Sequence, residues 1–222
     1  MHILYKYCPP ERASILHEHK IAYSHRSAIN DVFEMQPSVQ LQFSGKLTSP
    51  ANDRKIVHET LDSALVLCLS ETWDNIPMWS YYADGHKGFV IGLAAGHGFF
   101  NGSRARPVTY CAEYLVVNHK AGFEAAIFNK FEQWKHEREW RSLRVLDHDD
   151  AEYSQTDNNN GAYLYKFAPE LVKEVVLGCR IENTTRTDLC TSLSVSEYQH
   201  VSVYEAKPDD GNWKLVRRLT KP

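Results

Sequence analysis

The stretch that decides the fold is EREWRSLRVL, residues 137–146. As a strand, it places Glu137, Glu139 and Arg141 on the same face as Leu143 and Val145. Because leucine and valine belong in a core, this strand turns both carboxylates and the guanidinium inward. Buried charges are costly unless they are paired, hydrogen-bonded or used in chemistry. The stretch therefore predicts either an active site or a structural ion-pair ladder.

The residues before this strand add a lysine to the same group of charges. In a helix, Lys130, Trp134, Glu137 and Arg141 would follow one stripe at positions i, i+4, i+7 and i+11. We expect a helix from about residue 120 to 135 that leads into the strand. The charged run would then lie at a helix-to-strand junction.

The composition indicates an ordinary globular protein. The chain has 222 residues, of which 43% are hydrophobic and 24% charged, and we expect one domain over residues 1–222. The net charge of -3 argues against a surface built wholly for nucleic acid. No apolar stretch approaches the ~20 residues that span a bilayer, and the N-terminus lacks the apolar core of a signal peptide. We expect a cytoplasmic protein with no membrane partner; the oligomeric state is left open.

The cysteines and histidines predict no metal site. Five cysteines form no Cys-x-x-Cys pair and are odd in number, which is typical of free thiols in a reducing compartment. A nucleophile at Cys8 or Cys111 is the weaker alternative, because no base is implied near either. His17 and His19 would point to opposite sides of a helix, which disfavours zinc.

The hydrophobic pattern predicts the α+β class, with a mixed β-sheet and interleaved helices. A split sheet is one arrangement that this pattern allows. Strands are expected at 2–7, 21–23, 64–70, 89–93, 107–117, 137–146, 164–167, 172–177 and 201–206, and helices at about 9–19, 56–61, 77–84, 120–135 and 186–194. The acidic, asparagine-rich stretch 147–162 predicts a mobile loop.

An aromatic block at residues 77–88 provides candidates for ligand binding. Trp79, Tyr82 and His86 share one helical face, which could stack a nicotinamide, an adenine or a nucleic-acid base. Aromatic residues at this spacing are more often core. His86 and Lys87 lie in a glycine-flanked turn and are the better candidates for ligand contact.

The loop at residues 30–34 allows two interpretations. Asn30 and Asp31 can form side-chain turns while Phe33 anchors the loop in the core. Alternatively, Asp31 or Glu34 contacts a ribose or holds a metal. The chain contains neither Gly-x-Gly-x-x-Gly nor Gly-x-x-x-x-Gly-Lys, which disfavours ordinary dinucleotide folds and P-loops.

A series of motifs runs along most of the chain. They are LYKY at residues 4–7, Tyr23-Ser24, NDVFE at 30–34, MWSYYADGHKG at 78–88, Trp134 with EREWR at 137–141, and VVLGCR at 175–180. In this combination the chain resembles a large prokaryotic family that is described only as a domain of unknown function. Val32 stands where that family usually has proline. The resemblance implies no activity.

A more distant resemblance does imply an activity. ADP-ribosyltransferase-like folds clamp NAD with a split sheet; they carry Arg or His on a first strand, Ser, Thr or Tyr on a second, and Glu at the start of a late strand. Here the similar order is Tyr5 and Tyr7, then Ser24, then Glu137-x-Glu139. His2 comes too early to be the first-strand residue.

This resemblance implies roles for the site residues. Glu139 would contact the nicotinamide ribose and stabilise its developing positive charge. Glu137 would orient or deprotonate the incoming nucleophile, and Arg141 would complete the catalytic group. The NAD-binding residues would be Tyr5, Tyr7, Ser24, Asn30, Asp31, Trp79, Tyr82, His86 and Lys87.

The expected function is therefore an NAD-using ADP-ribosyltransferase-like enzyme, as a toxin or phage-defence effector that acts on a macromolecular target. One alternative is a metal-dependent nuclease in which Asp31, Glu34, Asp84, Glu137 and Glu139 supply ligands for Mg²⁺. It would lack the Glu-x-Lys ending typical of restriction-like nucleases. A second alternative is a non-catalytic module that senses a nucleotide.

Overall fold

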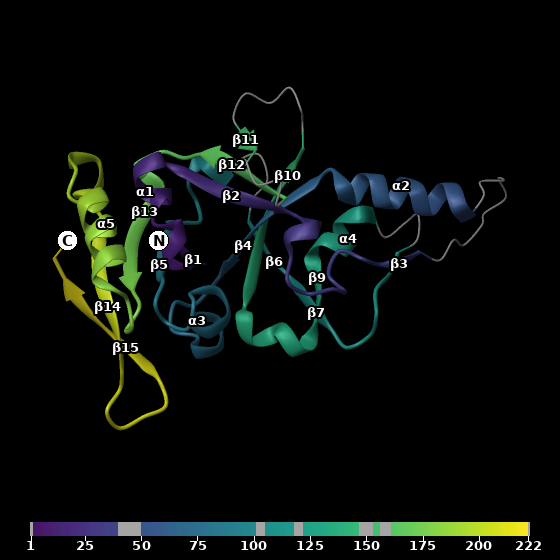
Figure 1. The fold of residues 1–222 in the computed structure, drawn as a ribbon. Helices are drawn as coiled ribbons and strands as arrows, with labels where there is room; N and C mark the ends of the chain where they lie inside the picture. Colours follow the sequence, from purple (N-terminus) through teal and green to yellow (C-terminus); the bar gives the residue numbers. More distant parts are fainter. Residues whose placement is uncertain are drawn as a thin grey trace.

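The computed structural model describes residues 2–39, 50–100, 105–117, 122–146, 153–155 and 161–221. Within them, a mixed 11-stranded sheet carries helices on both faces, which confirms the α+β class (Figure 1). The strands are β1 (Ile3–Cys8), β2 (Lys20–His25), β3 (Ser38–Val39), β4 (Ala64–Ser70), β5 (Phe89–Ala94), β6 (Arg106–Pro107), β7 (Thr109–Cys111), β8 (Val116–Val117), β9 (Asn129–Phe131), β10 (Glu139–Val145), β11 (Tyr153–Gln155), β12 (Ala162–Lys166), β13 (Val172–Leu177), β14 (Ser202–Pro208) and β15 (Leu215–Thr220).

The helices are short, apart from two. They are α1 (Ser14–Glu18), α2 (Pro50–Asp62), α3 (Ile76–Tyr82), α4 (Gly122–Phe128) and α5 (Asn183–Leu193). Among the described residues there are also six 3₁₀ turns: η1 (Pro10–Arg12), η2 (Arg26–Ala28), η3 (Gly98–Phe100), η4 (Glu132–Glu137), η5 (Pro169–Leu171) and η6 (Ser196–Tyr198). No helix in the described ranges is long and apolar enough to cross a membrane.

The main sheet has the order β11-β12-β2-β4-β1-β5-β13-β14-β15, and it is split at β4. Strand β10 pairs along the whole of one edge of β4, from Glu139 opposite Ser70 to Val145 opposite Ala64. The other edge is shared, because β1 pairs only at Ser70 and β2 only at residues 65–66. Residues 67–69 lie in the gap and pair there with no described strand. The split sheet follows from this divergence of β1 and β2.

The two faces of the sheet carry different cores. On one face, a single large cluster under α1 and α5 includes Leu4, Leu67 and Leu189, all fully buried. The opposite face has two separate apolar clusters. One lies around α3 and contains Trp79, and the other lies around α2 and α4 and contains Leu61. The inward-facing charges of β10 lie on this second face, where the apolar packing is interrupted.

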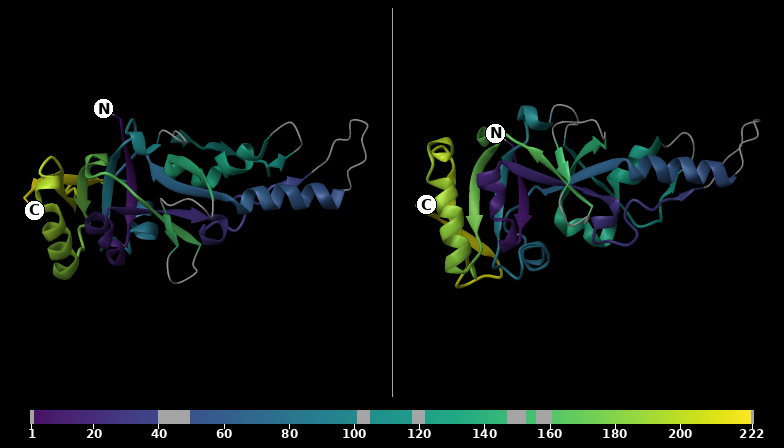
Figure 2. Two further views of the ribbon diagram at one scale, coloured as in Figure 1. Left: turned by 90° about the horizontal axis from the view of Figure 1, so that it is seen from above. Right: turned by 45° about the horizontal axis from the view of Figure 1, so that its top comes forward.

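The molecule is elongated, and its ends are formed by different parts of the chain. Helix α2 and the short strand β3 extend at one end, and α5, β14 and β15 form the other (Figure 1, Figure 2). The split of the sheet lies between them. Its central position brings the N-terminal strands together with residues 130–141.

The prediction of one helix over 120–135 is wrong. Helix α4 ends at Phe128, the chain then pairs with β7 through β9, and η4 follows as a 3₁₀ turn. The expected strand at 107–117 is three short strands, β6, β7 and β8. Residues 109–111 pair in parallel with β9. This pairing replaces the helix that the sequence pattern predicts at 129–131 and interrupts the strand that it predicts at 107–117. Tertiary context, rather than periodicity, decides this region.

The inward face of β10 is confirmed for Glu139 and Arg141, which are 4% and 0% exposed. Glu137 is also buried, but it ends η4 rather than opening the strand, since Arg138 adopts a left-handed φ of 45°. Val145 is 65% exposed, so the prediction that it faces the core is wrong. It is the last residue of β10 and pairs with Ala64, the first residue of β4.

The predicted loop over 147–162 is partly a strand. Residues 153–155 form β11, which pairs with β12, and Ala162 already belongs to β12. The loop prediction is wrong for these residues, because β12 offers a free edge for pairing. Gly161 forms a bend, in agreement with the prediction, while residues 147–152 and 156–160 and the predicted mobility lie outside what the structure describes.

Candidate functional site

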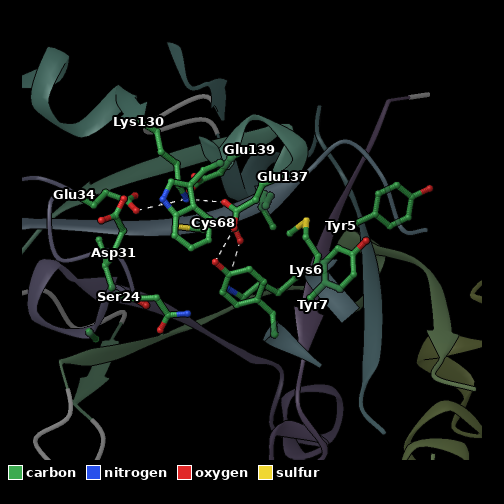
Figure 3. A pocket seen from close by; sticks show the side chains of 17 residues that line it. Tyr5, Lys6, Tyr7, Ser24, Asp31, Glu34, Cys68, Lys130, Glu137 and Glu139 are labelled. Carbon is green, nitrogen blue, oxygen red and sulfur yellow. Dashed lines mark hydrogen bonds and ion pairs between the residues drawn. The ribbon is translucent and has the colours of Figure 1, made fainter. Parts of the chain in front are cut away.

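A cavity of about 190 Å³ opens at the split of the sheet (Figure 3). Its walls come from β1, β2, β4 and β10, from α3, from residues 28–34 (the last residue of η2 and the loop after it), and from β9 with η4. On the unpaired edge of β4, Nζ of Lys6 donates a 3.3 Å hydrogen bond to the carbonyl of Cys68. The gap in the sheet is thus a cavity with several charged side chains in its lining, between two apolar clusters.

Lys130 lies among three glutamates, Glu34, Glu137 and Glu139, and together these four side chains form the charged wall of the cavity. Its Nζ lies 2.6 Å from Oε2 of Glu137, 2.8 Å from Oε2 of Glu139 and 3.5 Å from Oε2 of Glu34. The ring of Trp134 lies 5.1 Å from the same ammonium. Desolvation lowers the pKa of Lys130, but the carboxylates of Glu139 and Glu137 outweigh it, and the net shift is upward. Lys130 is therefore a buried cation.

Arg141 fixes Glu139 from behind the cavity. Its Nε and Nη2 atoms donate to the two oxygens of Glu139 at 2.8 and 3.0 Å, and Nη1 donates to the carbonyl of Ile127. Its guanidinium also forms an ion pair with Glu34. Burial lowers the pKa of Arg141 to about 9, so it stays charged at neutral pH. Arg141 does not line the cavity and acts on it through Glu139.

The two glutamates of the Glu-x-Glu pair differ in how fully they are bound. Glu139 accepts two N–H groups from Arg141 and one from Lys130, while burial raises its pKa against the effect of Lys130. Glu137 accepts one bond from Lys130 and one of 2.7 Å from the hydroxyl of Tyr82. A carboxylate has about four acceptor positions, so Glu137 retains more capacity toward the cavity.

The cavity as a whole carries more negative than positive charge. In the part of the chain that the structure describes, its lining contains the carboxylates of Asp31, Glu34, Glu137 and Glu139 and two ammonium groups, those of Lys6 and Lys130. In Figure 3, Asp31 and Glu34 lie on one side, Tyr5 and Tyr7 on the other, and the Glu-x-Glu carboxylates between them. Such a lining favours a neutral or cationic group over an anion.

Many of the predicted site residues meet in this cavity. They are Tyr5, Tyr7, Ser24, Asn30, Asp31, Tyr82, Glu137 and Glu139. The two first-strand tyrosines contribute ring surfaces. The hydroxyl of Tyr7 is bound to Thr72 and Asn75, at 2.9 and 3.2 Å. Burial and the carboxylate of Glu174 raise the pKa of Tyr5 to about 12.

The other predicted residues lie elsewhere. Trp79 is fully buried in the core beneath α3, where its Nε1 donates to the carbonyl of Trp73 at 2.7 Å. His86 stacks on Trp79 with ring centroids 5.9 Å apart, in a turn with a left-handed φ of 72°. Lys87 is exposed and forms an ion pair of 3.3 Å with Asp84. These residues hold the turn after α3 and do not line the cavity.

Four residues that line the cavity are not among the predicted site residues. They are Lys130, Trp134, Lys6 and Cys68. The spacing of Lys130, Trp134 and Glu137 does bring all three to one wall, although through β9 and η4 rather than a helix. Nothing in the local pattern signals Lys6 or Cys68. They meet because β1 and β2 diverge along β4, which is a property of the assembled sheet.

No family model, curated protein or solved structure matches the chain. Among the residues that the structure describes, no group of three His, Cys, Asp or Glu side chains is arranged to hold a metal ion. Glu34, Glu137 and Glu139 do converge, but the ammonium of Lys130 lies among them. The comparisons therefore assign no function to the cavity, and a proposal for its function depends on its residues and their geometry.

Proposed function

We propose that the chain is an ADP-ribosyltransferase-like enzyme that uses NAD. One observation carries the proposal: Tyr5 of β1, Ser24 of β2 and Glu139, the first residue of β10, line one cavity at the split of the sheet. The first two strands and the start of a later one are the elements on which that class of fold carries its NAD-binding residues. Residues 134 positions apart in the sequence thus meet in one place.

The charge of the lining supports this chemistry. When the bond between nicotinamide and the ribose C1′ breaks, positive charge develops on the ribose, and fixed carboxylates in a site shielded from water stabilise it. The nicotinamide ring of NAD is also cationic before the bond breaks. The net negative lining suits the nicotinamide riboside part of NAD, and the rings of Tyr82 and Trp134 offer apolar surface beside it.

Glu137 is the better candidate for the carboxylate that contacts the ribose. Its Oε1 is held by Tyr82 alone and its Oε2 by Lys130, whereas three N–H groups bind Glu139. This assignment reverses the roles expected from the sequence. Glu139, held by Arg141, keeps Lys130 in place, and Lys130 in turn orients Glu137.

In the proposed reaction, nicotinamide takes the electron pair of the broken bond and a carboxylate of this cavity takes the proton. The C1′–N bond breaks and its electron pair leaves with nicotinamide, which becomes neutral. The acceptor's lone pair forms the new bond to C1′, and the acceptor's proton passes to Asp31. Asp31 is a half-buried carboxylate of the lining, whose side chain also accepts a 2.9 Å bond from the backbone of Phe33.

No specific observation favours the metal-dependent nuclease. Lys130 takes the position among the three glutamates that a divalent cation would need, with Nζ–O distances of 2.6, 2.8 and 3.5 Å. Asp84, another carboxylate of that hypothesis, pairs with Lys87 and does not line the cavity. An ammonium already satisfies the carboxylates there.

Release of nicotinamide from NAD in the presence of a cell lysate tests the proposal. We expect turnover by the native chain and a loss of about 100-fold or more in Glu137→Gln. The matched control is Glu132→Gln, at an exposed residue of the same 3₁₀ turn, which should keep full activity. NAD binding without release would instead assign a nucleotide-sensing module. Absence of both would refute the proposal.

A further inference from the structure

A second cavity, of about 250 Å³, lies behind the charged wall of the first. It is enclosed by the loop at residues 31–37, the segment at 111–115 and the elements α4 and β9. The hydroxyl of Tyr114 donates to the carbonyl of Gln36, which joins the loop to the opposite segment. The rings of Phe33 and Tyr114 also meet edge to face, with centroids 6.3 Å apart.

The two cavities share three charged residues. Asp31, Glu34 and Lys130 line both, so one wall separates the two spaces, and Glu34 and Lys130 form an ion pair within it. Within this wall, Lys130 is bound to Glu34 at 3.5 Å on one side and to the Glu-x-Glu pair on the other. A ligand in the second cavity would reach the same charged network as a ligand in the first.

The lining of the second cavity is mostly apolar and its mouth is aromatic. Phe33, Tyr114 and Phe131 are 66%, 52% and 41% exposed, which is unusual for three large rings around one opening. Among the described residues, the charged groups of the lining are the carboxylates of Asp31, Glu34 and Glu113 and the ammonium of Lys130. Apolar walls with a net negative end are complementary to an apolar chain that carries a cation.

We propose that the second cavity binds a ligand with an apolar chain that ends in an ammonium or guanidinium group. The chain lies between Phe33 and Phe131, and the cation meets Asp31 at the shared wall. This site does not depend on the proposed NAD chemistry, since it is defined by its own lining. It is a place for a second small molecule.

Binding of hexylammonium to the whole native chain, without NAD, tests this proposal by calorimetry. The comparison probes are hexanol, which has the same chain without charge, and hexanoate, which has the opposite charge. We expect hexylammonium to bind at least several-fold more tightly than hexanol, and hexanoate to bind most weakly. Asp31→Asn should remove the preference for the cation and leave the binding of hexanol unchanged.

Two exposed neighbours provide a matched pair of variants. Phe33→Ser should weaken the binding of both hexylammonium and hexanol several-fold, because Phe33 lines the mouth. Val32→Ser should change neither, because Val32 is 72% exposed and lines neither cavity. The proposal is overturned if none of the probes binds, if hexanoate binds as tightly as hexylammonium, or if the two variants behave alike. Failure of NAD turnover leaves all of these results unaffected.

Discussion

Nζ of Lys130 lies 2.6 Å from Oε2 of Glu137, although one residue belongs to β9 and the other ends η4. Both side chains are almost completely buried, at 5% and 3% exposed. The bond closes the segment 130–137 into one unit, to which Glu139 and Glu34 contribute from other parts of the chain. Two members of this unit, Glu34 and Lys130, line both cavities.

Removal of the central cation should destabilise the fold strongly. In Lys130→Met, three buried carboxylates lose their common partner, and breaking a buried ion pair costs about 3–5 kcal/mol. Urea unfolding of the native chain and the variant measures the difference. Lys135→Met, at an exposed site of η4, should change the free energy of unfolding by less than about 0.5 kcal/mol. Equal effects of the two substitutions would show that the buried network contributes no stability.

The turn after α3 depends on a close approach of two backbone segments. A Cβ on Gly178 would overlap the carbonyl oxygens of His86 and Gly88, and the amide of Gly178 donates to Gly88 at 2.9 Å. Gly178→Ala should therefore lower the free energy of unfolding by about 2 kcal/mol. Gly96→Ala is the control, because no atom lies within 4 Å of its added Cβ. Thermal and urea unfolding of both variants would show whether only the first site is tight.

Alkaline pH should destabilise the protein through its buried phenols. Burial raises the pKa of Tyr5 and of Tyr110 from 10.0 to about 12. Between these values the unfolded chain loses phenol protons that the folded chain retains, so stability falls as pH rises. The raised pKa of Lys130 acts in the same direction above 10.5, its ordinary value. Urea unfolding at about pH 8 and about pH 11 should show this loss.

A pair of variants separates the phenol contribution from general alkaline denaturation. The hydroxyl of Tyr110 accepts a 2.8 Å bond from the backbone N–H of Glu139. Tyr110→Phe should lower stability at neutral pH and reduce the further loss at alkaline pH. The exposed Tyr81 provides the control, because Tyr81→Phe removes no buried phenol. An unchanged pH dependence in Tyr110→Phe would contradict the assignment.

The sequence predicts the strands of this fold better than it predicts what surrounds the site. The apolar run at 64–70 is β4 with the predicted bounds, because seven apolar or small residues in succession favour a buried strand. The inward face of Glu139 and Arg141 also follows from alternation with Leu143. These features depend only on local periodicity.

The remaining features depend on pairing between distant segments. The local sequence pattern of residues 129–131 favours a helix. They form a strand instead because β7 pairs with them. Ser24 reaches the cavity because β2 pairs with β4 only at residues 65–66, and β1 pairs with β4 only at Ser70. The edge of β4 between these two pairings is therefore open beside Ser24. Trp79 shares a helical face with Tyr82, yet only Tyr82 lines the cavity. The face of α3 that meets the cavity carries Met78 and Tyr82, at i and i+4, and it leaves Trp79 in the core.

The most direct test of the account is whether NAD occupies the cavity at the split. Ala28 lines this cavity and is exposed, so Ala28→Trp should fill its mouth without disturbing the core. Val32→Trp adds the same ring at an exposed position outside both cavities. Calorimetric titration with NAD should show binding to the native chain and to Val32→Trp, and none to Ala28→Trp. Equal NAD binding by both variants, or no binding by the native chain, would contradict the account.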